Sequence, residues 1–509
     1  MSLEAALIAA QSGLTLVNRQ IAAASSNIAN AGTAGATRKT VSGSIIVAGD
    51  STFGVRTGEV KRAVDDALLA GRDAARSAAA GAKVREALLQ TVEAAQGTPG
   101  QGGGVGDLTA ALDTAFTALA DNPADTIAQT AVVTAAQDLV TVYHDISQTI
   151  GDVRQQAQDG IVSEVAALND AVREVSSLTV QIRTLQAQGA STAALEDQRD
   201  AAISRISESV EVKALHSSDG GVTLIGRNGV VLPLDPKGDL FTVGDGTVSA
   251  GDWYGGSGSL PGIHMGGVDV TQRLIGGRLA EYVTLRDTTL PRMQAELDVA
   301  AGTTASRLEA QGLRLFTNAA GTVPDLTQPY ASSGLLGFAS AIQVNADVVA
   351  NPGLVRDGTH AVANGAGGAT GFTPNPAGGP AAFSTLITRI TDFAFGTEVS
   401  AGVTQPAFVS GGLGPDGTLT SSIGAARSLL DYTSRLTASQ TAERTQATAA
   451  REQAEGLEAL LDDRFAKQSG VDTDTELASM VNLQTAYAAN ARVLSAVQQM
   501  FDTLFAAVK

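Results

Sequence analysis

The 509-residue sequence has no cysteine and only 4% aromatic residues, and each shortage excludes a class of protein. Without cysteine there is no disulfide framework, no thiol nucleophile and no thiolate metal site. With so few aromatic rings, the cores must rely on small aliphatic side chains and on close approach of the backbone. The hydrophobic content of 44% is nevertheless ample for several cores, so we expect a globular, multidomain chain.

Positive charge is also scarce, because 34 Lys and Arg face 52 Asp and Glu and leave a net charge of -18. Nucleic acid and anionic membrane surfaces would repel such a chain, so neither is an expected partner. Long apolar runs are missing too, and membrane insertion is not expected. The first positive charge is Arg19, so no cleaved signal peptide is predicted. This favours a cytoplasmic protein unless export uses a route without cleavage.

Chemical motifs are equally sparse. The histidines are scattered without the spacing of a zinc site, and no Gly-x-Ser-x-Gly elbow lies near one of them. A Ser-His-Asp triad stays open, because triads assemble in space rather than along the chain. Asp472, Asp474 and Glu476 alternate like the start of a calcium loop, but Leu477 stands where that loop needs glycine. We therefore predict no catalytic, cofactor or metal residue, and no enzyme. The four histidines are His144, His216, His264 and His360.

The end of the chain predicts one long helix with an apolar seam. Asp472 to Asp474 supply oxygens for an N-cap, and no Gly or Pro interrupts the residues that follow. A 3,4 spacing over ten positions, apolar except for two glutamines, is typical of a coiled-coil seam. These positions are Leu477, Met480, Gln484, Tyr487, Ala491, Leu494, Gln498, Phe501, Phe505 and Val508.

The start of the chain carries a matching seam at the same spacing. Because isolated helices are marginal in water, we expect the two seams to pair and to bring the chain termini together. An ordinary bundle helix at each end is the alternative interpretation. The N-terminal positions are Leu3, Leu7, Ala10, Leu14, Val17, Ile21, Ala24 and Ile28.

Between the two ends, period-2 and helical patterns alternate and predict an elongated α+β multidomain protein. Residues 1–60 and 471–509 form a terminal coiled-coil assembly domain, with one or two strands between 41 and 60. Residues 61–209, 271–318 and 423–470 form a bundle of long helices, in which Pro291 kinks or restarts a helix. Residues 210–270 form a small β region, where Asn228-Gly229 predicts a type I′ hairpin turn. Residues 319–422 are predicted to be an inserted, β-rich outer domain.

Several short motifs resemble those of known proteins. Asn27-Ile28-Ala29-Asn30-Ala31-Gly32-Thr33 resembles the Asn-Ile-Ala-Asn signature of bacterial flagellar rod, hook and hook-associated proteins, although Ala34 and Ala36 replace its usual Pro and Tyr. Asp197-Gln198-Arg199-Asp200 is similar to a motif of the flagellar hook-associated protein 1 (FlgK) family. So are the Asn-Pro step at 122–123 and the helix around Pro291. For the four polar residues at 197–200 themselves, a capped network on a helix surface is the simpler interpretation.

The resemblance implies a structural axial component of the bacterial flagellum, at the hook–filament junction, which takes part in flagellum assembly and motility. It implies export through the flagellar type III channel without a cleaved signal, an extracellular location and no cofactor. The implied partners are the flagellar hook protein, hook-associated protein 3 (FlgL-type), other copies of the chain and a FlgN-type export chaperone.

We expect self-assembly through both terminal helices and chaperone binding on the C-terminal one. The predicted assembly residues are Leu3, Leu7, Leu14, Val17, Ile21, Asn27, Ile28, Asn30, Leu477, Met480, Tyr487, Leu494, Phe501 and Phe505. The predicted chaperone-binding residues are Leu477, Met480, Tyr487, Leu494 and Phe501.

Two alternatives remain open at this point. A hook or distal-rod protein would share the Asn-Ile-Ala-Asn region, but such chains are dominated by strands after residue 60, where this chain predicts long helices. A secreted enzyme built on a helical bundle would need clustered polar residues in a cleft.

Overall fold

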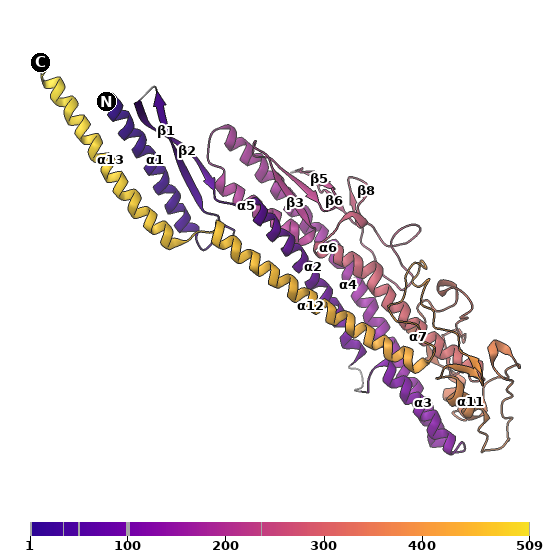
Figure 1. Cartoon of the computed structure of the whole chain (residues 1–509). Helices are drawn as coiled ribbons and strands as arrows, with labels where there is room; N and C mark the ends of the chain where they lie inside the picture. The colour runs from indigo at the N-terminus through magenta and orange to yellow at the C-terminus, as the bar shows by residue number, and fades with distance from the viewer. Residues whose placement is uncertain (1–2, 34, 49–50, 98–101, 236, 508–509) are drawn as a thin grey trace.

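The computed structural model describes residues 3–33, 35–48, 51–97, 102–235 and 237–507 of an elongated α+β molecule. Its first helix, α1 (Leu3–Asn30), and its last, α13 (Thr473–Ala507), lie side by side at one end, so the two chain termini meet there (Figure 1). The side chain of Asp472 accepts hydrogen bonds from the backbone N–H groups of Asp474 (3.0 Å) and Thr475 (3.3 Å), and this caps α13 as expected.

A long antiparallel hairpin follows α1. It consists of β1 (Lys39–Ala48) and β2 (Ser51–Arg62), and it packs one face on α1. Gly43 allows this close approach, because a Cβ atom there would lie 2.5 Å from the Leu16 side chain. Strand β2 ends at Arg62. It thus includes residues 61 and 62, where the sequence predicted the start of a helix.

The bundle begins with α2 (Asp66–Gln96) and α3 (Val105–Asp121) and is built on α4 (Thr126–Ala187), a helix of 62 residues. It continues with α5 (Ala193–Ser209), α6 (Gly277–Thr284), α7 (Leu290–Gln311) and α12 (Leu429–Ser469). A π-helical turn, Leu285–Thr289, joins α6 to α7, and Pro291 lies in the first turn of α7. The predicted kink or restart at this proline takes the form of this π-helical turn, which runs directly into α7, since proline cannot donate the hydrogen bond of a helix interior. The apolar faces of these helices meet in one large core and a smaller one beside α5 and α6.

Helix α12 is attached to α2 mainly by charges. Between Gln440 and Phe465 only Ala447 is buried, so few apolar side chains contribute to this contact. Acidic and basic side chains of the two helices alternate along the contact instead. The ion pairs are Arg76–Glu458, Lys83–Glu455, Arg85–Glu443, Arg444–Glu93 and Arg451–Glu86.

Two small antiparallel sheets occupy residues 210–270. One has the order β3 (Val212–His216), β4 (Val222–Gly226), β5 (Val231–Leu232), and the other β6 (Phe241–Thr242), β7 (His264–Met265), β8 (Val268–Asp269). The turn between β4 and β5 is closed by a hydrogen bond from Gly229 N–H to Gly226 O (2.8 Å). Type I′ was the wrong prediction, because only glycines have positive φ in the described chain and Asn228 would need it as well. A short 3₁₀ turn, Thr271–Arg273, follows.

The segment expected to be a β-rich insertion, residues 319–422, differs from that expectation. Its strands have two or three residues, and short helices and irregular loops make up the rest, because Gly, Pro and Asn interrupt each apolar run. Its apolar side chains share the large core of the bundle. The elements in and beside this segment are β9 (Phe316–Thr317), a 3₁₀ turn Tyr330–Ser332, α8 (Phe338–Ala341), β10 (Gln343–Val344), α9 (Ala346–Ala350), α10 (Leu354–Asp357), a 3₁₀ turn Ala366–Gly368, α11 (Thr385–Phe393), β11 (Glu398–Ser400) and β12 (Val403–Thr404).

Candidate assembly surface

The two terminal helices approach closely where glycine faces asparagine. A Cβ atom on Gly13 of α1 would lie 3.1 Å from Oδ1 of Asn490 on α13, so a larger residue would push the helices apart. The eight seam positions of α1 are all covered to some degree. Ala10, Val17 and Ala24 are buried, and Leu3, Leu7, Leu14, Ile21 and Ile28 are half-buried.

On α13 the covered seam is rotated relative to the predicted one. The column Met480, Tyr487, Leu494, Phe501 is common to both, and three of these side chains are half-buried while Tyr487 is 42% exposed. The second covered column lies one residue earlier than predicted. Leu477 and Phe505 are therefore exposed, at 51% and 67%, and Val508 lies outside the described residues. The second covered column is Glu476, Leu483, Asn490 and Val497.

The polar members of that column explain the difference. Apolar periodicity skips Glu476 and Asn490, although both face the rest of the molecule. Glu476 is 3% exposed and accepts a hydrogen bond from Nε of Arg38 at 2.7 Å. A polar side chain that is satisfied in this way can occupy a seam position without an apolar signal.

The two asparagines of the Asn-Ile-Ala-Asn region form contacts within the subunit. Asn27 is 1% exposed, and its side chain both accepts from N–H and donates to O of Lys39, each at 2.9 Å. It therefore fixes the first residue of β1 against α1. Asn30 donates to the carbonyl oxygen of Ser26 at 2.8 Å, inside the last turn of α1.

The Asp-Gln-Arg-Asp residues hold the terminal region to the bundle. Asp197 on α5 accepts hydrogen bonds from Thr37 Oγ1 (2.6 Å), Lys39 Nζ (2.5 Å) and Arg62 Nη1 (3.1 Å). Arg62 also donates to Asp200 at 2.6 Å. The prediction of a helix-surface network is wrong here, because Asp197, Arg199 and Asp200 are all less than 9% exposed. We call Thr37, Lys39, Arg62, Glu196, Asp197 and Asp200 the junction cluster.

Burial and charge oppose each other inside the junction cluster. Burial alone raises the pKa of Asp200, but hydrogen bonding to His216 and the charge of Arg62 outweigh it and hold that pKa below its ordinary value. Burial likewise disfavours the charged form of Arg62, yet Asp200, Glu196 and Asp197 raise its pKa overall. The cluster is therefore a set of buried charges that are stable only together.

Apart from Ile8 on α1, the exposed large apolar side chains of the terminal region lie on two elements. On α13 they are spread along the length of the helix, and on the hairpin they gather near its tip. This concentration matters because the bundle buries almost all of its large apolar side chains. The exposed residues are Leu477, Val481, Tyr487, Val493, Met500, Leu504 and Phe505 on α13, and Ile45, Ile46 and Val47 on β1.

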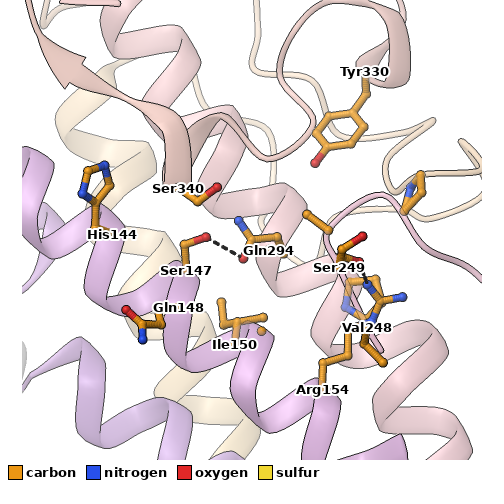
Figure 2. Close-up of a pocket in the computed structure, with 14 residues that line it drawn as sticks. His144, Ser147, Gln148, Ile150, Arg154, Val248, Ser249, Gln294, Tyr330 and Ser340 are labelled. Carbon is orange, nitrogen blue, oxygen red and sulfur yellow. Dashed lines mark hydrogen bonds between the residues drawn. The ribbon is translucent and has the colours of Figure 1, made fainter. Parts of the chain in front are cut away.

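A cavity of about 330 Å³ lies between α4, α7 and the loops that follow them, and Figure 2 shows its lining. Ser147 donates to Oε1 of Gln294 (3.1 Å), and His144 Nε2 lies 2.7 Å from the carbonyl oxygen of Ile342. Arg154 donates to the carbonyl oxygens of Arg286, Ser249 and Asp252, and burial lowers its pKa to about 10. These polar groups hold loops in place. His144 and Ser147 bond to other partners, so they do not form a hydrogen-bonded serine–histidine pair.

Two searches of the described part of the chain gave negative results. No cluster of three or more His, Asp or Glu side chains there could hold a metal ion. No helix among the described residues is long and apolar enough to cross a bilayer.

Known proteins resemble the chain in two regions. Residues 90–321 match the family model described as the flagellar hook-associated protein FlgK helical domain, and residues 463–506 match the flagellar basal body rod FlgEFG protein C-terminal model. Flagellar hook-associated protein 1 of Salmonella typhimurium is 26% identical over 236 residues, which are 44% of this chain and 41% of that protein. The Bacillus subtilis protein of the same name is 28% identical over 131 residues, or 25% of this chain and 26% of that one.

The matched stretches thus span less than half the length of these relatives. Among solved structures, the flagellar hook junction protein FlgK from Burkholderia pseudomallei aligns with a TM-score of 0.41 and 22% identity. That alignment covers 50% of this chain and 45% of the other.

Proposed function

We propose that the chain is a flagellar hook-associated protein of the FlgK type, a structural axial subunit of the flagellum that forms the junction between hook and filament. The match of residues 90–321 to the FlgK helical domain supports this proposal. Proteins of this type are structural flagellar components, so the same match supports the prediction that the chain is not an enzyme.

The observation that carries the proposal is the incomplete cover of α13. This helix contacts α1 along one side, and seven large apolar side chains remain exposed on the others. Burying a medium-sized apolar side chain contributes about 1.5–3 kcal/mol. A subunit that leaves several of them in water gains this free energy when neighbouring copies cover them. Assembly into a tube supplies such neighbours, and both terminal helices are positioned to take part.

A deletion strain complemented with variants of the chain tests this role. Removing residues 472–509 deletes α13 and leaves the bundle, whose core does not include α13. We expect the truncated protein to remain folded, and the strain to make hooks without filaments. Electron microscopy and a motility assay measure the outcome. Val268→Asp is the control, since Val268 is 56% exposed on β8, far from α13, and should leave motility normal. Normal filaments on the truncation strain would contradict the proposal.

We further propose that the partners are the hook protein, hook-associated protein 3 and other copies of the chain. The apolar surface at the terminal end supports contacts along the axis and around it, because exposed side chains lie along most of α13 and at the hairpin tip. Pull-down of each purified partner by the full chain and by the truncated chain tests these contacts. Equal capture by both would show that α13 is not the binding element.

Export without a cleaved signal, and capture of α13 by a FlgN-type chaperone before export, complete the proposal. The two sides of α13 allow a sharp test of how a chaperone would bind. Leu477→Asp and Tyr487→Asp change exposed positions, whereas Met480→Asp, Leu494→Asp and Phe501→Asp change positions that lie half-buried in the folded subunit. If the chaperone binds α13 detached from α1, both groups of variants lose binding. If neither group does, α13 is not the chaperone site.

A rod or hook protein is the second candidate, and one observation favours it: the match of residues 463–506 to a C-terminal model named for rod proteins. The longer match, residues 90–321, is to a helical domain named for the hook-associated protein and lies in the bundle. Immunogold labelling of isolated hook–basal bodies separates the two. Label at the distal end of the hook supports the junction role, and label on the rod or along the hook supports the alternative.

A further inference from the structure

The hairpin β1–β2 has an outer surface that nothing in the subunit covers. Among the described residues its two strands pair with no third strand, although side chains of α1 bond the backbone of Lys39, Val41 and Val55. Ile45 is 70% exposed and Val47 62% exposed, close to the tip. Two-stranded hairpins are marginal alone in water, and exposed edges and apolar tips are places where another chain binds. The hairpin therefore has the character of a docking element.

The hairpin and α13 lie on opposite sides of α1. Ser12 of α1 accepts a hydrogen bond from Val55 N–H of the hairpin at 3.1 Å, while the next residue, Gly13, meets Asn490 of α13. Figure 1 shows the same order, with α13 on one flank of α1 and the hairpin on the other. A subunit thus presents an uncovered apolar surface on each of two opposite flanks, which is the arrangement of a head-to-tail contact that can close into a ring.

The hairpin and α13 can be compared by their positions along the axis of α1. The level of Ser12 and Gly13 corresponds to the Ile46–Gly54 pair of the hairpin on one side and to Asn490 on the other. A neighbour placed beside the subunit without axial shift therefore brings Ile45 and Val47 opposite the part of α13 that follows Asn490. The exposed apolar residue there is Val493, 48% exposed.

Charge at the base of the two flanks is complementary in the same register. The exposed charged side chains of β2 are Arg56, Glu59 and Lys61, so the strand is basic overall, and Lys61, paired with Thr40, lies nearest the base of the hairpin. Asp472 and Asp474, at the start of α13, are exposed as well. The ion pair between Arg38 and Glu476 joins these two bases within the subunit, so they lie at one level. The register that places the apolar tip of the hairpin against α13 of the next copy also places the basic end of the hairpin against the acidic start of that helix.

On the basis of the proposed junction role, we propose that the hairpin of one subunit docks on the outward surface of α13 in the next copy. The apolar contact joins Ile45 and Val47 to Val493, and Lys61 faces Asp472 and Asp474. The occupant of the hairpin surface is thus a second copy of this chain, with each subunit giving its hairpin and receiving one.

Cysteine cross-linking tests the contact, and the absence of native cysteine makes it clean. The full chain carries Ile45→Cys together with Val493→Cys, is expressed in the deletion strain, and is oxidised in isolated hook–basal bodies. We expect dimers and higher multimers on a non-reducing gel. Each single variant should remain monomeric. The matched register control joins Ile45→Cys to Leu477→Cys, because Leu477 is also exposed on α13 but lies about 24 Å further along the helix.

Each outcome decides something. Multimers from the 45/493 pair but not from the 45/477 pair support the proposed docking. Equal multimers from both pairs, or none from either in particles that contain the protein, overturn the docking and leave the junction role intact. Absence of the protein from the isolated particles refutes the junction role, and the docking with it. Ile45→Asp provides a second measurement, since an exposed substitution should preserve the circular dichroism spectrum while subunit incorporation falls at least tenfold relative to Val268→Asp.

Discussion

Replacing Asp197 by alanine should loosen the terminal region from the bundle. This carboxylate receives three side-chain hydrogen bonds, two of them from Lys39 and Arg62, whose side chains are only 10% and 8% exposed. In the variant, Lys39 keeps only the carbonyl oxygen of Thr37 at 3.2 Å, while Arg62 retains Glu196 and Asp200. One buried cation thus loses its carboxylate partner.

The expected cost is about 3 kcal/mol. Removing one partner of a buried ion pair typically destabilises a protein by about 3–5 kcal/mol, because the remaining charge stays buried and uncompensated. The lower end of that range applies because Arg62 keeps two of its three carboxylates. The cost falls on the junction between α1, β1 and α5, whereas the interior of the bundle contains none of these side chains.

Hydrogen exchange monitored by mass spectrometry resolves this local effect. Amides of β1 and of residues 35–38 should exchange roughly a hundredfold faster in Asp197→Ala, since 1.4 kcal/mol corresponds to about a factor of ten. Amides in the middle of α4 should be unchanged. Glu174→Ala is the control, because the Glu174–Arg205 pair is about half exposed on both sides and such pairs contribute about 0–1 kcal/mol. Similar exchange in both variants would refute the view that the junction cluster holds the two regions together.

Three further predictions concern stability. Full burial raises the pKa of Asp298 to about 6 in spite of its hydrogen bonds. As the pH rises from about 4 to about 6, the unfolded chain loses this proton before the folded protein does, so the free energy of unfolding falls by up to about 3 kcal/mol. Thermal unfolding of Asp298→Asn should lack this loss, and parallel pH profiles of the two proteins would contradict it. Leu483→Asp should release α13 from α1, whereas Leu477→Asp should not, as measured by hydrogen exchange of α13; equal effects would restore the seam predicted from sequence. Gly13→Leu should also weaken the contact between α1 and α13, because the added side chain meets Asn490. Gly13→Ala should be nearly neutral, because its better helix propensity offsets the small shift that one methyl group requires. Unchanged thermal unfolding of Gly13→Leu would show that the two helices are not in close contact there.

The long helices and the positions of some of their ends could be predicted from the sequence. The 3,4 spacing predicted both terminal helices, Asp472 predicted the start of α13, and Pro291 predicted the kink or restart where α7 begins. These features depend on interactions within one or two helical turns, which a local pattern contains. The α+β class followed from the same patterns, since each change of period marks a change of element.

Features that depend on distant residues could not be read in this way. The rotation of the α13 seam depends on Arg38, which satisfies Glu476, and on Gly13, which accommodates Asn490. The burial of Asp197 depends on Lys39 and Arg62, which lie more than 130 residues away. An acidic residue within a polar helix gives no local sign that cations from another region will cover it.

The prediction of a β-rich domain for residues 319–422 was wrong for a different reason. Its short apolar runs have the length of strands, and the sequence gives no signal that they pack individually onto the bundle instead of pairing with each other. Tyr330 shows the actual arrangement, since its hydroxyl donates to the buried carboxylate of Asp298 on α7 at 2.7 Å. The loops are anchored one by one to an existing helix.

The charged contact between α2 and α12 has a consequence for a subunit that is only partly folded. When an apolar interface opens, it leaves sticky surfaces that aggregate, but an interface made of ion pairs leaves two hydrated ones. The part of α12 that follows Ala447 can therefore separate from α2 and return with little apolar surface exposed, while Leu429, Tyr432 and Leu436 stay in the large core. Reversible fraying of this kind would let the second half of α12 unwind and refold repeatedly at little risk of precipitation.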